Sequence, residues 1–260
     1  MHSGADFSRY PFFIRRMDTR GFLEAAQESS SSLPIVGFVY LTSGDVLVEV
    51  ENTSYLIGAG HLLLIPENVA FAIHHYSDAV GYTGGFQPSF FGDAKSLQFL
   101  REPLQQAFWF DEGAFMGELF NMLALRFERG DMAFIEKGLE LLLTRVRALP
   151  SLHLPPPVSG FLDRLFSDGR SLLTASAYAA EMNLSINYLN RVVKRSTGRP
   201  LGFWIDTARL NRAKRMLKDS SLPMIDIAAA AGFFDQAYFA RFFKKHTGMT
   251  PSAFRVAMHG

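Results

Sequence analysis

Short, mainly apolar runs follow one another between Leu33 and about Phe91, and turn residues separate them. The pattern predicts strands at Val36–Leu41, Val46–Val50, Ser54–Ile57, Leu62–Ile65 and Val69–His74. Ser43-Gly44-Asp45 and Glu51-Asn52 are turn signals between successive runs. Short strands at such intervals favour an all-β sandwich or barrel.

The apolar period changes to three and four residues between Ser96 and Leu149, as on one face of a helix. The two series are Leu119, Met122, Leu123 and Phe127, then Ile135, Leu139, Leu142, Leu143 and Val146. At least two helices are predicted here, packed on the β-rich part or on a second subunit.

A proline-rich segment, residues 150–157, follows the helical series and carries four prolines in eight residues. Proline fixes its own φ and biases the preceding residue away from helix, so the segment predicts a stiff, extended linker. Up to Leu154 there are 11 Lys and Arg against 18 Asp and Glu, and from Pro155 onward 15 against 7. An acidic part followed by a basic part suggests that only the second meets a polyanion, although chance clustering of solvated charges gives the same pattern.

The basic part contains an internal repeat with an offset of 50 residues, between residues 179–198 and 229–248. The identical positions are Tyr188 and Tyr238, Arg191 and Arg241, Lys194 and Lys244, and Thr197-Gly198 and Thr247-Gly248. Each copy predicts a short Ala-rich helix, a tight turn and a second helix, which is a helix-turn-helix arrangement. Ser185 and Asp235 are the expected N-caps, and Gly198 and Gly248 the expected C-terminal glycines.

The second helix of each copy has one polar side. In the first copy the exposed stripe is Asn187, Asn190, Arg191 and Lys194, and in the second it is Ala237, Ala240, Arg241 and Lys244. Asn and Arg can read adenine and guanine edges in a DNA major groove. We therefore expect DNA contacts from Ser185, Asn187, Asn190, Arg191, Lys194, Gln236, Ala237, Arg241, Lys244 and Lys245, with more base reading by the first helix. A solvated helix face is the plainer alternative for either stripe alone.

A single helix is predicted between the copies, from Gly202 to Lys218. It would hold the two reading helices about one DNA turn apart, roughly 34 Å. Arg209 and Arg212 on this helix are candidates for phosphate contact or for internal ion pairs with Asp206 or Asp226.

Composition narrows the class of protein. The 260 residues are 48% hydrophobic, which is enough for buried cores, and they include no cysteine. Disulfides, a thiolate nucleophile and Cys-based metal sites are thereby excluded. The sequence shows neither a long apolar run nor the layout of a signal peptide, so we expect a soluble, cytoplasmic protein without a membrane segment.

The chain from Ala230 to Arg255 resembles the AraC/XylS-type transcriptional regulators, in the series Ala230-Ala231-Gly232-Phe233, Tyr238 to Gly248 and Thr250-Pro251 to Arg255. The expected linker helix also fits, and Phe234 departs from the family pattern, which commonly has a polar residue there. Tyr55 to Pro66 and Gly81 to Phe86 look like strands of the family's N-terminal cupin-like β-barrel.

The resemblance implies an α+β protein with four parts. These are a cupin-like, effector-binding β-domain at 1–95, a helical dimerisation segment at 96–149, the linker at 150–157, and a DNA-binding domain of two helix-turn-helix motifs joined by a linker helix at 158–260. The implied function is that of a transcriptional regulator, more commonly an activator, acting as a homodimer. Its partners would be double-stranded promoter DNA, RNA polymerase and a small effector, with no cofactor and no catalysis.

Effector candidates are aromatic and polar residues on the predicted strands: Phe38, Tyr40, Tyr55, His74, Tyr82 and Phe86. Aromatic faces with hydroxyl groups suit a sugar or an aromatic metabolite, and core packing is the plainer reading of each residue. His74 and His75 are adjacent, so on a regular strand they point to opposite faces. We therefore expect no metal site.

Two alternatives remain. The β-domain could serve dimerisation alone, without an effector. A cupin-type metalloenzyme is the other, and it would need a cluster of metal ligands or an acid–base pair that the sequence does not display.

Overall fold

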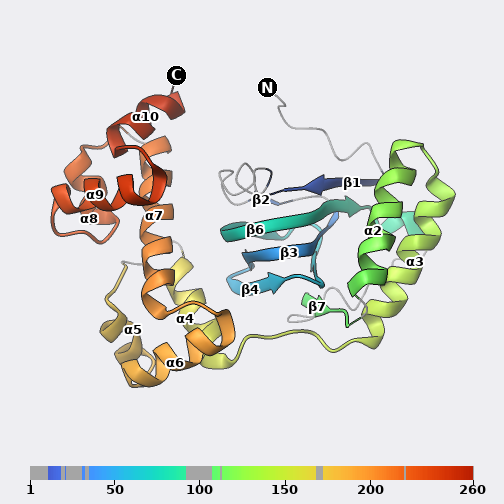
Figure 1. Ribbon diagram of the computed structural model, residues 1–260, viewed down its shortest axis with the longest axis horizontal. Helices are drawn as coiled ribbons and strands as arrows, with labels where there is room; N and C mark the ends of the chain where they lie inside the picture. Colours follow the sequence, from blue (N-terminus) through green and yellow to red (C-terminus); the bar gives the residue numbers. More distant parts are fainter. Residues whose placement is uncertain are drawn as a thin grey trace. The chain divides into compact units, whose positions relative to one another are not determined.

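The computed structural model describes residues 11–18, 21, 31–32, 35–91, 107–111, 113–167, 172–219 and 221–259. The chain divides into two compact units, Met1–Leu154 and Pro155–Gly260 (Figure 1). The first unit contains an antiparallel sheet with helices, and the second is helical, which confirms the mixed fold class at this level. The expected start of the helical segment, residues 96–106, lies outside the described residues.

The sheet of the first unit has strand order β1-β6-β3-β5-β7, with β2 beside β6 and β4 beside β3. The strands are β1 (Phe12–Met17), β2 (Ser31–Ser32), β3 (Val36–Val50), β4 (Thr53–Gly58), β5 (His61–Ile65), β6 (Ala70–Phe86) and β7 (Ala107–Trp109). All of these pairs are antiparallel. A 3-10 turn, η2 (Pro88–Phe91), follows β6.

β3 passes through the predicted turn at Ser43-Gly44-Asp45 without reversing, so the expectation of two separate strands there was wrong. It pairs with β6 from Val36 to Val50, and the ladder shifts register on both sides of Ser43. Gly44 has φ +71°, and a Cβ there would lie 2.3 Å from the Asp78 carbonyl oxygen. Gly44 therefore allows the irregular pairing of β3 with β6 at this point, where β6 passes too close for a side chain.

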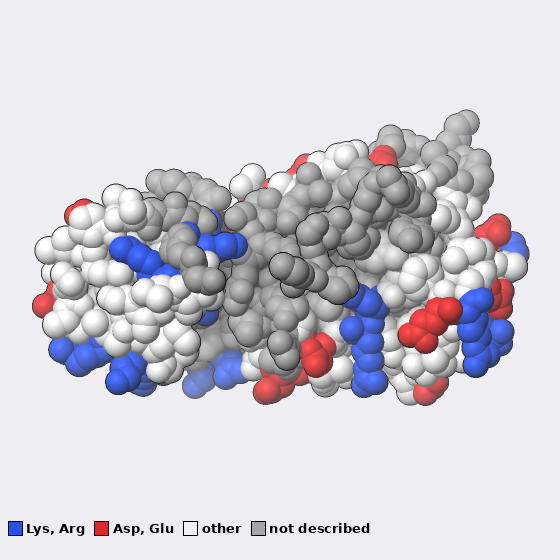
Figure 2. Space-filling model, turned by 90° about the horizontal axis from the view of Figure 1, so that it is seen from above, with Lys and Arg blue, Asp and Glu red and all other residues white. Residues whose placement is uncertain are grey.

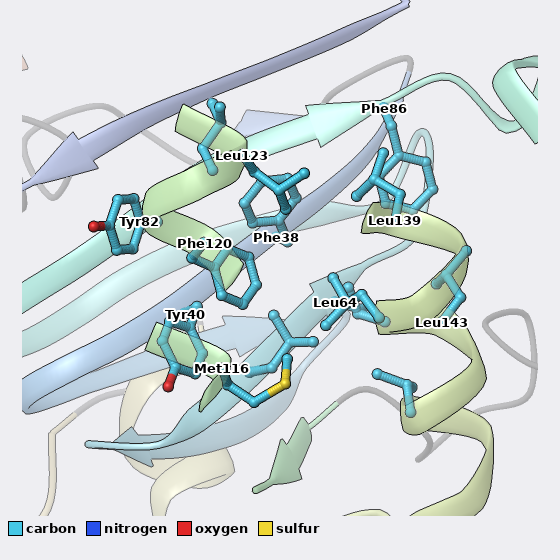
Figure 3. Packing of buried hydrophobic residues seen from close by; sticks show 14 of the residues in the cluster. Phe38, Tyr40, Leu64, Tyr82, Phe86, Met116, Phe120, Leu123, Leu139 and Leu143 are labelled. Carbon is cyan, nitrogen blue, oxygen red and sulfur yellow. The ribbon is translucent and has the colours of Figure 1, made fainter. Parts of the chain in front are cut away.

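Side chains on the two faces of the sheet join different cores. Phe38 and Tyr40 lie in a cluster with residues of α2 (Gly113–Glu128) and α3 (Met132–Ala148), which pack on that face (Figure 3). Val39 and Leu41 alternate with them and lie in a second, mainly aliphatic cluster. Both faces are thus apolar, as the pattern of nearly continuous hydrophobic runs indicates.

A bulge in β6 changes the expected orientation of the two histidines. Leu47 pairs with His75 and the next residue, Val48, with Ile73, so His74 is the extra residue. His74 Nε2 lies 2.7 Å from Glu49 and His75 Nε2 lies 3.3 Å from Asp45. Glu49 and Asp45 are four residues apart on one strand, so both histidines lie on the same face. The expectation of opposite faces assumed a regular strand and was wrong.

The second unit is built around one long helix. Its elements are α4 (Pro156–Phe166), α5 (Ala175–Glu181), α6 (Ile186–Thr197), α7 (Leu201–Asp219), α8 (Met224–Ala230), α9 (Gln236–Thr247) and α10 (Pro251–His259). α7 contacts α4, α5 and α6 on one side of the repeat and α8 and α10 on the other (Figure 1). Pro156 and Pro157 begin α4 and are not extended linker, because proline is tolerated where the first N–H groups lack intrahelical partners.

Candidate nucleic-acid interface

The two helix-turn-helix copies begin their second helices in the same way. Ser185 Oγ accepts a hydrogen bond from the Tyr188 backbone N–H at 3.2 Å, and the Asp235 carboxylate accepts from the Tyr238 N–H. Each side chain satisfies an N–H group that the first helical turn leaves unpaired. Both expected N-caps are confirmed.

The two copies also end alike. Gly198 and Gly248 have φ +71° and +80°, in the left-handed region that favours glycine after a helix. Just before them, Thr197 Oγ1 donates to the Val193 carbonyl and Thr247 Oγ1 to the Phe243 carbonyl, each at 2.8 Å. The repeat seen in the sequence is therefore a repeat of local hydrogen bonding.

Apolar side chains fix which side of each second helix faces outward. Leu189 and Val193 of α6 are fully buried. On α9 the buried residues are Phe239, Phe242 and Phe243, which pack with the side chains of α7, α8 and α10. The side opposite each buried row is left to solvent.

All ten predicted DNA-contact residues are exposed: Ser185, Asn187, Asn190, Arg191, Lys194, Gln236, Ala237, Arg241, Lys244 and Lys245. Arg191 lies with its guanidinium carbon 5.6 Å from the centre of the Tyr188 ring, one turn earlier on the same helix. Stacking on an aromatic ring restricts a long side chain that would otherwise lose rotamer freedom on binding. Contact of these residues with DNA stays a prediction.

Asn190 has a structural partner that the sequence pattern did not suggest. Its Oδ1 accepts a hydrogen bond from the Leu201 backbone N–H at 3.0 Å, at the start of α7. The amide oxygen thus caps the long helix, and the Nδ2 group keeps both of its donors for a base edge. The repeat contained an indication of this role. In the second copy, the Thr250 Oγ1 caps α10 by accepting from the Ala253 N–H. The equivalent residue before α7 is Pro200, whose side chain has no acceptor, so the cap of α7 comes from another residue.

We expect Asn190→Ala to lower the free energy of unfolding of the C-terminal unit by about 1 kcal/mol, the usual net value of one hydrogen bond. Asn187→Ala is the matched control, since it makes the same change on the exposed side of the same helix and should stay within about 0.5 kcal/mol of wild type. Urea unfolding of the full chain measures both. Equal stabilities of the two variants would contradict the capping role.

α7 is tied to the second copy by Arg209. Its guanidinium lies 3.6 Å from the Asp206 carboxylate and 5.4 Å from the centre of the Phe233 ring, in the turn before α9. Burial raises the pKa of Asp206, and the charges of Arg209, His246 and Lys245 oppose that rise. Of the two roles considered for Arg209, the structure supports the internal ion pair with Asp206.

Burial also lowers the pKa of Lys214, one turn further along α7. The contacts of Arg209 with Asp206 and Phe233 place one cation of α7 within the packing of the unit. The exposed cations of α6 and α9 are therefore the better candidates for a polyanion.

The face of the C-terminal unit drawn in Figure 2 carries more Lys and Arg than Asp and Glu. From Pro155 onward the chain has 15 Lys and Arg against 7 Asp and Glu. At 1.5 Å per residue, the 19 residues of α7 span about 28 Å, with one helix-turn-helix packed toward each end. This length agrees with the expectation for two readers spaced along one DNA duplex.

The predicted effector residues lie mostly in packed cores. Phe38, Tyr40, Tyr82 and Phe86 belong to the cluster against α2 and α3, and Phe120 of α2 stacks on Tyr40 with ring centres 4.4 Å apart (Figure 3). Tyr55 is buried in the aliphatic cluster on the other face. His74 is paired with Glu49. The six residues do not converge on one site.

Metal-binding side chains do not gather either. Within the described ranges, no group of three or more His, Asp or Glu residues is close enough to hold a metal ion. Burial lowers the pKa of His61, whose Nδ1 accepts from the Gly58 N–H at 2.9 Å and closes the turn between β4 and β5. Over the same ranges, no helix is long and apolar enough to cross a membrane.

A helix-turn-helix domain family matches residues 178–257, which contain both copies of the repeat. The chain is similar to the Msm operon regulatory protein of Streptococcus mutans, with 26% identity over 159 residues, covering 61% of this chain and 52% of that protein. It is also similar to the arabinose operon regulatory protein of Escherichia coli, with 33% identity over 123 residues, covering 45% and 41%. The matches thus span about half or less of these relatives, whose names describe regulators and not enzymes.

Among solved structures, the C-terminal domain of AraT, a response regulator from Geobacillus stearothermophilus, is 28% identical. The match covers 41% of this chain and 88% of that one, with a TM-score of 0.38.

Proposed function

We propose that this chain is a sequence-specific, DNA-binding regulator of transcription of the AraC type. The match of residues 178–257 to a helix-turn-helix domain family supports this proposal. The observation that carries the proposal is the duplicated reading helix. α6 and α9 share their capping, their buried rows and their outward cations, and α7 joins them. One copy alone would be compatible with a solvated helix face, whereas two copies on a shared core repeat the same outward surface.

We propose that the first unit provides dimerisation through α2 and α3. Each of these helices carries large apolar side chains that remain exposed: Phe115 and Leu125 on α2, and Leu141 on α3. Exposed apolar side chains on neighbouring helices are suited to a second copy of the same surface. A homodimer would present four reading helices, and in this proposal it acts together with RNA polymerase, more often as an activator.

The first unit would also bind a small effector, a sugar or an aromatic metabolite, that favours one arrangement of the protein over another. A second candidate role is dimerisation without an effector. The packing of Phe38, Tyr40, Tyr82 and Phe86 against the helices favours this second role, because those side chains already have protein partners.

DNA binding is tested by selecting duplexes from a random pool with the full-length chain. We expect an enriched sequence whose affinity falls steeply with salt, by a slope of about −0.9 for each phosphate neutralised. Recovery of no preferred sequence at any salt concentration would reject the proposed function.

The effector is tested by thermal unfolding of the full-length chain with a panel of sugars and aromatic acids. A ligand present at 100 times its Kd should raise the free energy of unfolding by about 2.7 kcal/mol. A dimer that binds the selected duplex and shows no shift across the panel would favour the role in dimerisation alone.

A further inference from the structure

Two adjacent phenylalanines in the second copy have opposite environments. Phe233 is 5% exposed and packs on Phe239 and Phe242, with ring centres 5.3 and 4.9 Å away. Phe234 is 107% exposed, so its ring contacts almost nothing within the structure. A single exposed apolar residue is common on protein surfaces. Phe234 is of interest because of its position in the helix-turn-helix motif.

Phe234 lies at the tip of a reading helix, immediately before the N-cap Asp235. Ala237 and Tyr238 follow within the first turn of α9 and are also exposed. Further along the same side come Arg241 and Lys244, at steps of three and four residues. The exposed residues at the beginning of α9 therefore include the apolar Phe234 and Ala237 beside the polar Gln236, and those toward its end are cationic.

The two reading helices differ in charge at their N-termini. α6 is capped by the neutral hydroxyl of Ser185, whereas α9 is capped by the carboxylate of Asp235. A helix N-terminus attracts phosphate through its unpaired N–H groups, but a carboxylate at the cap occupies one of them and repels another anion. The tip of α9 therefore favours a neutral, apolar group over a phosphate.

We infer that Phe234, together with Ala237, contacts the C5-methyl groups of thymines in the major groove. This inference rests on the proposed DNA-binding function and names the base chemistry that α9 reads. The major groove offers a match for both parts of the α9 surface. Thymine methyls at its floor suit the apolar side chains, and phosphates along its edges suit the cations. Arg241, Lys244 and Lys245 make an anionic occupant the better fit for this side of the helix.

The first copy has a less exposed apolar tip, where Ile186 and Tyr188 are 43% and 38% exposed, against 107% and 53% for Phe234 and Tyr238. Leu184 stands at the position equivalent to Phe234, and it is half-buried. α6 then presents Asn187 and Arg191, which suit polar base edges. The two copies would thus read different chemistry, with hydrogen-bonding edges under α6 and thymine methyls under α9.

The test uses the full-length chain and the duplex that it selects from the random pool. Fluorescence anisotropy measures the Kd for that duplex and for versions in which deoxyuridine replaces thymine, so that only the methyl group is lost. For wild type we expect the substitution under α9 to weaken binding about fourfold for each contacted methyl, the factor that corresponds to roughly 0.8 kcal/mol for one buried methylene. Phe234→Ser should bind the thymine duplex that much more weakly and lose the distinction between thymine and uracil at the base whose methyl Phe234 contacts, while Ala237 keeps its own contact.

Val256→Ser is the matched control, because Val256 is also a large apolar residue, 72% exposed, and lies on α10. It should retain wild-type affinity and the wild-type response to uracil. Circular dichroism verifies that each variant is folded, which we expect because both replaced side chains are exposed.

Two outcomes would overturn the inference. Phe234→Ser could retain wild-type affinity and uracil sensitivity, and the exposed ring would then belong to a surface for a protein partner. Alternatively it could weaken binding to both duplexes and keep the wild-type difference between them, which would show that the residue acts without touching a methyl. Neither outcome is the same as a wild-type chain that selects no sequence, which would reject DNA binding itself.

Discussion

Replacing Arg191 by alanine is expected to weaken binding to the selected duplex by about 5- to 150-fold, equivalent to about 1–3 kcal/mol. The reason is that a guanidinium can donate two hydrogen bonds to the O6 and N7 atoms of one guanine, and alanine offers none. Arg191 is exposed on the outward side of α6, and stacking on Tyr188 restricts its guanidinium before DNA arrives. Anisotropy titrations against the selected duplex and a scrambled duplex measure the effect.

Lys194→Ala serves as the comparison on the same helix side. As a point charge, Lys194 should contact phosphate, so its loss should weaken the selected and scrambled duplexes alike and lower the salt slope by about one. Arg191→Ala should instead reduce the ratio between the two affinities. If Arg191→Ala kept the wild-type affinity for the selected duplex, the docking of α6 in the groove would be wrong.

Replacing Phe120 by alanine is expected to lower the free energy of unfolding of the first unit by about 3–5 kcal/mol. The Phe120 ring is fully buried, stacks on Tyr40 and lies 5.7 Å from the ring of Phe38 and 6.0 Å from that of Tyr82. Alanine would leave an apolar cavity between the sheet and α2, because neighbours on a sheet and a helix can close it only in part. Urea unfolding followed by near-ultraviolet circular dichroism measures the loss.

Phe115→Ala is the control for this change, since Phe115 belongs to the same helix and is 46% exposed. Its unfolding free energy should change by no more than about 0.5–1 kcal/mol. A loss equal to that of Phe120→Ala would mean that Phe115 is covered in solution, as in the proposed dimer. A small effect of Phe120→Ala itself would contradict the packing of α2 on the sheet.

The second unit was the more predictable from sequence because its determinants are local. Ser185 and Asp235 cap the helix that begins at the next residue, and Gly198 and Gly248 end it, so each signal lies within a few residues of its effect. Each of these signals also occurs twice, once in each copy of the repeat. The sequence did not reveal the partner of Asn190, because its amide oxygen accepts from an N–H 11 residues away, after a turn.

The first unit was harder because its determinants are distant. Ser43-Gly44-Asp45 has the composition of a hairpin turn, yet the ladder with β6 keeps it within one strand. The residues around His74 do not indicate the bulge there. Likewise, the sequence around Tyr40 does not indicate that Phe120, 80 residues later, stacks on its ring. In each case a pairing between remote segments outweighs a local preference.

The single helix α7 limits how this protein can change over evolution. Its first residues belong to one core, where Trp204 donates to Thr197, and its last belong to the other, where Ala213 and Leu217 lie among the residues of α8 and α9. One inserted residue would turn everything beyond it by about 100° and advance it by 1.5 Å. Under the proposed DNA-binding function, such an insertion would point one reading helix away from the duplex. Descendants of this chain are therefore expected to acquire new binding sites by exchanging side chains on α6 and α9, while the interval between the two half-sites stays constant.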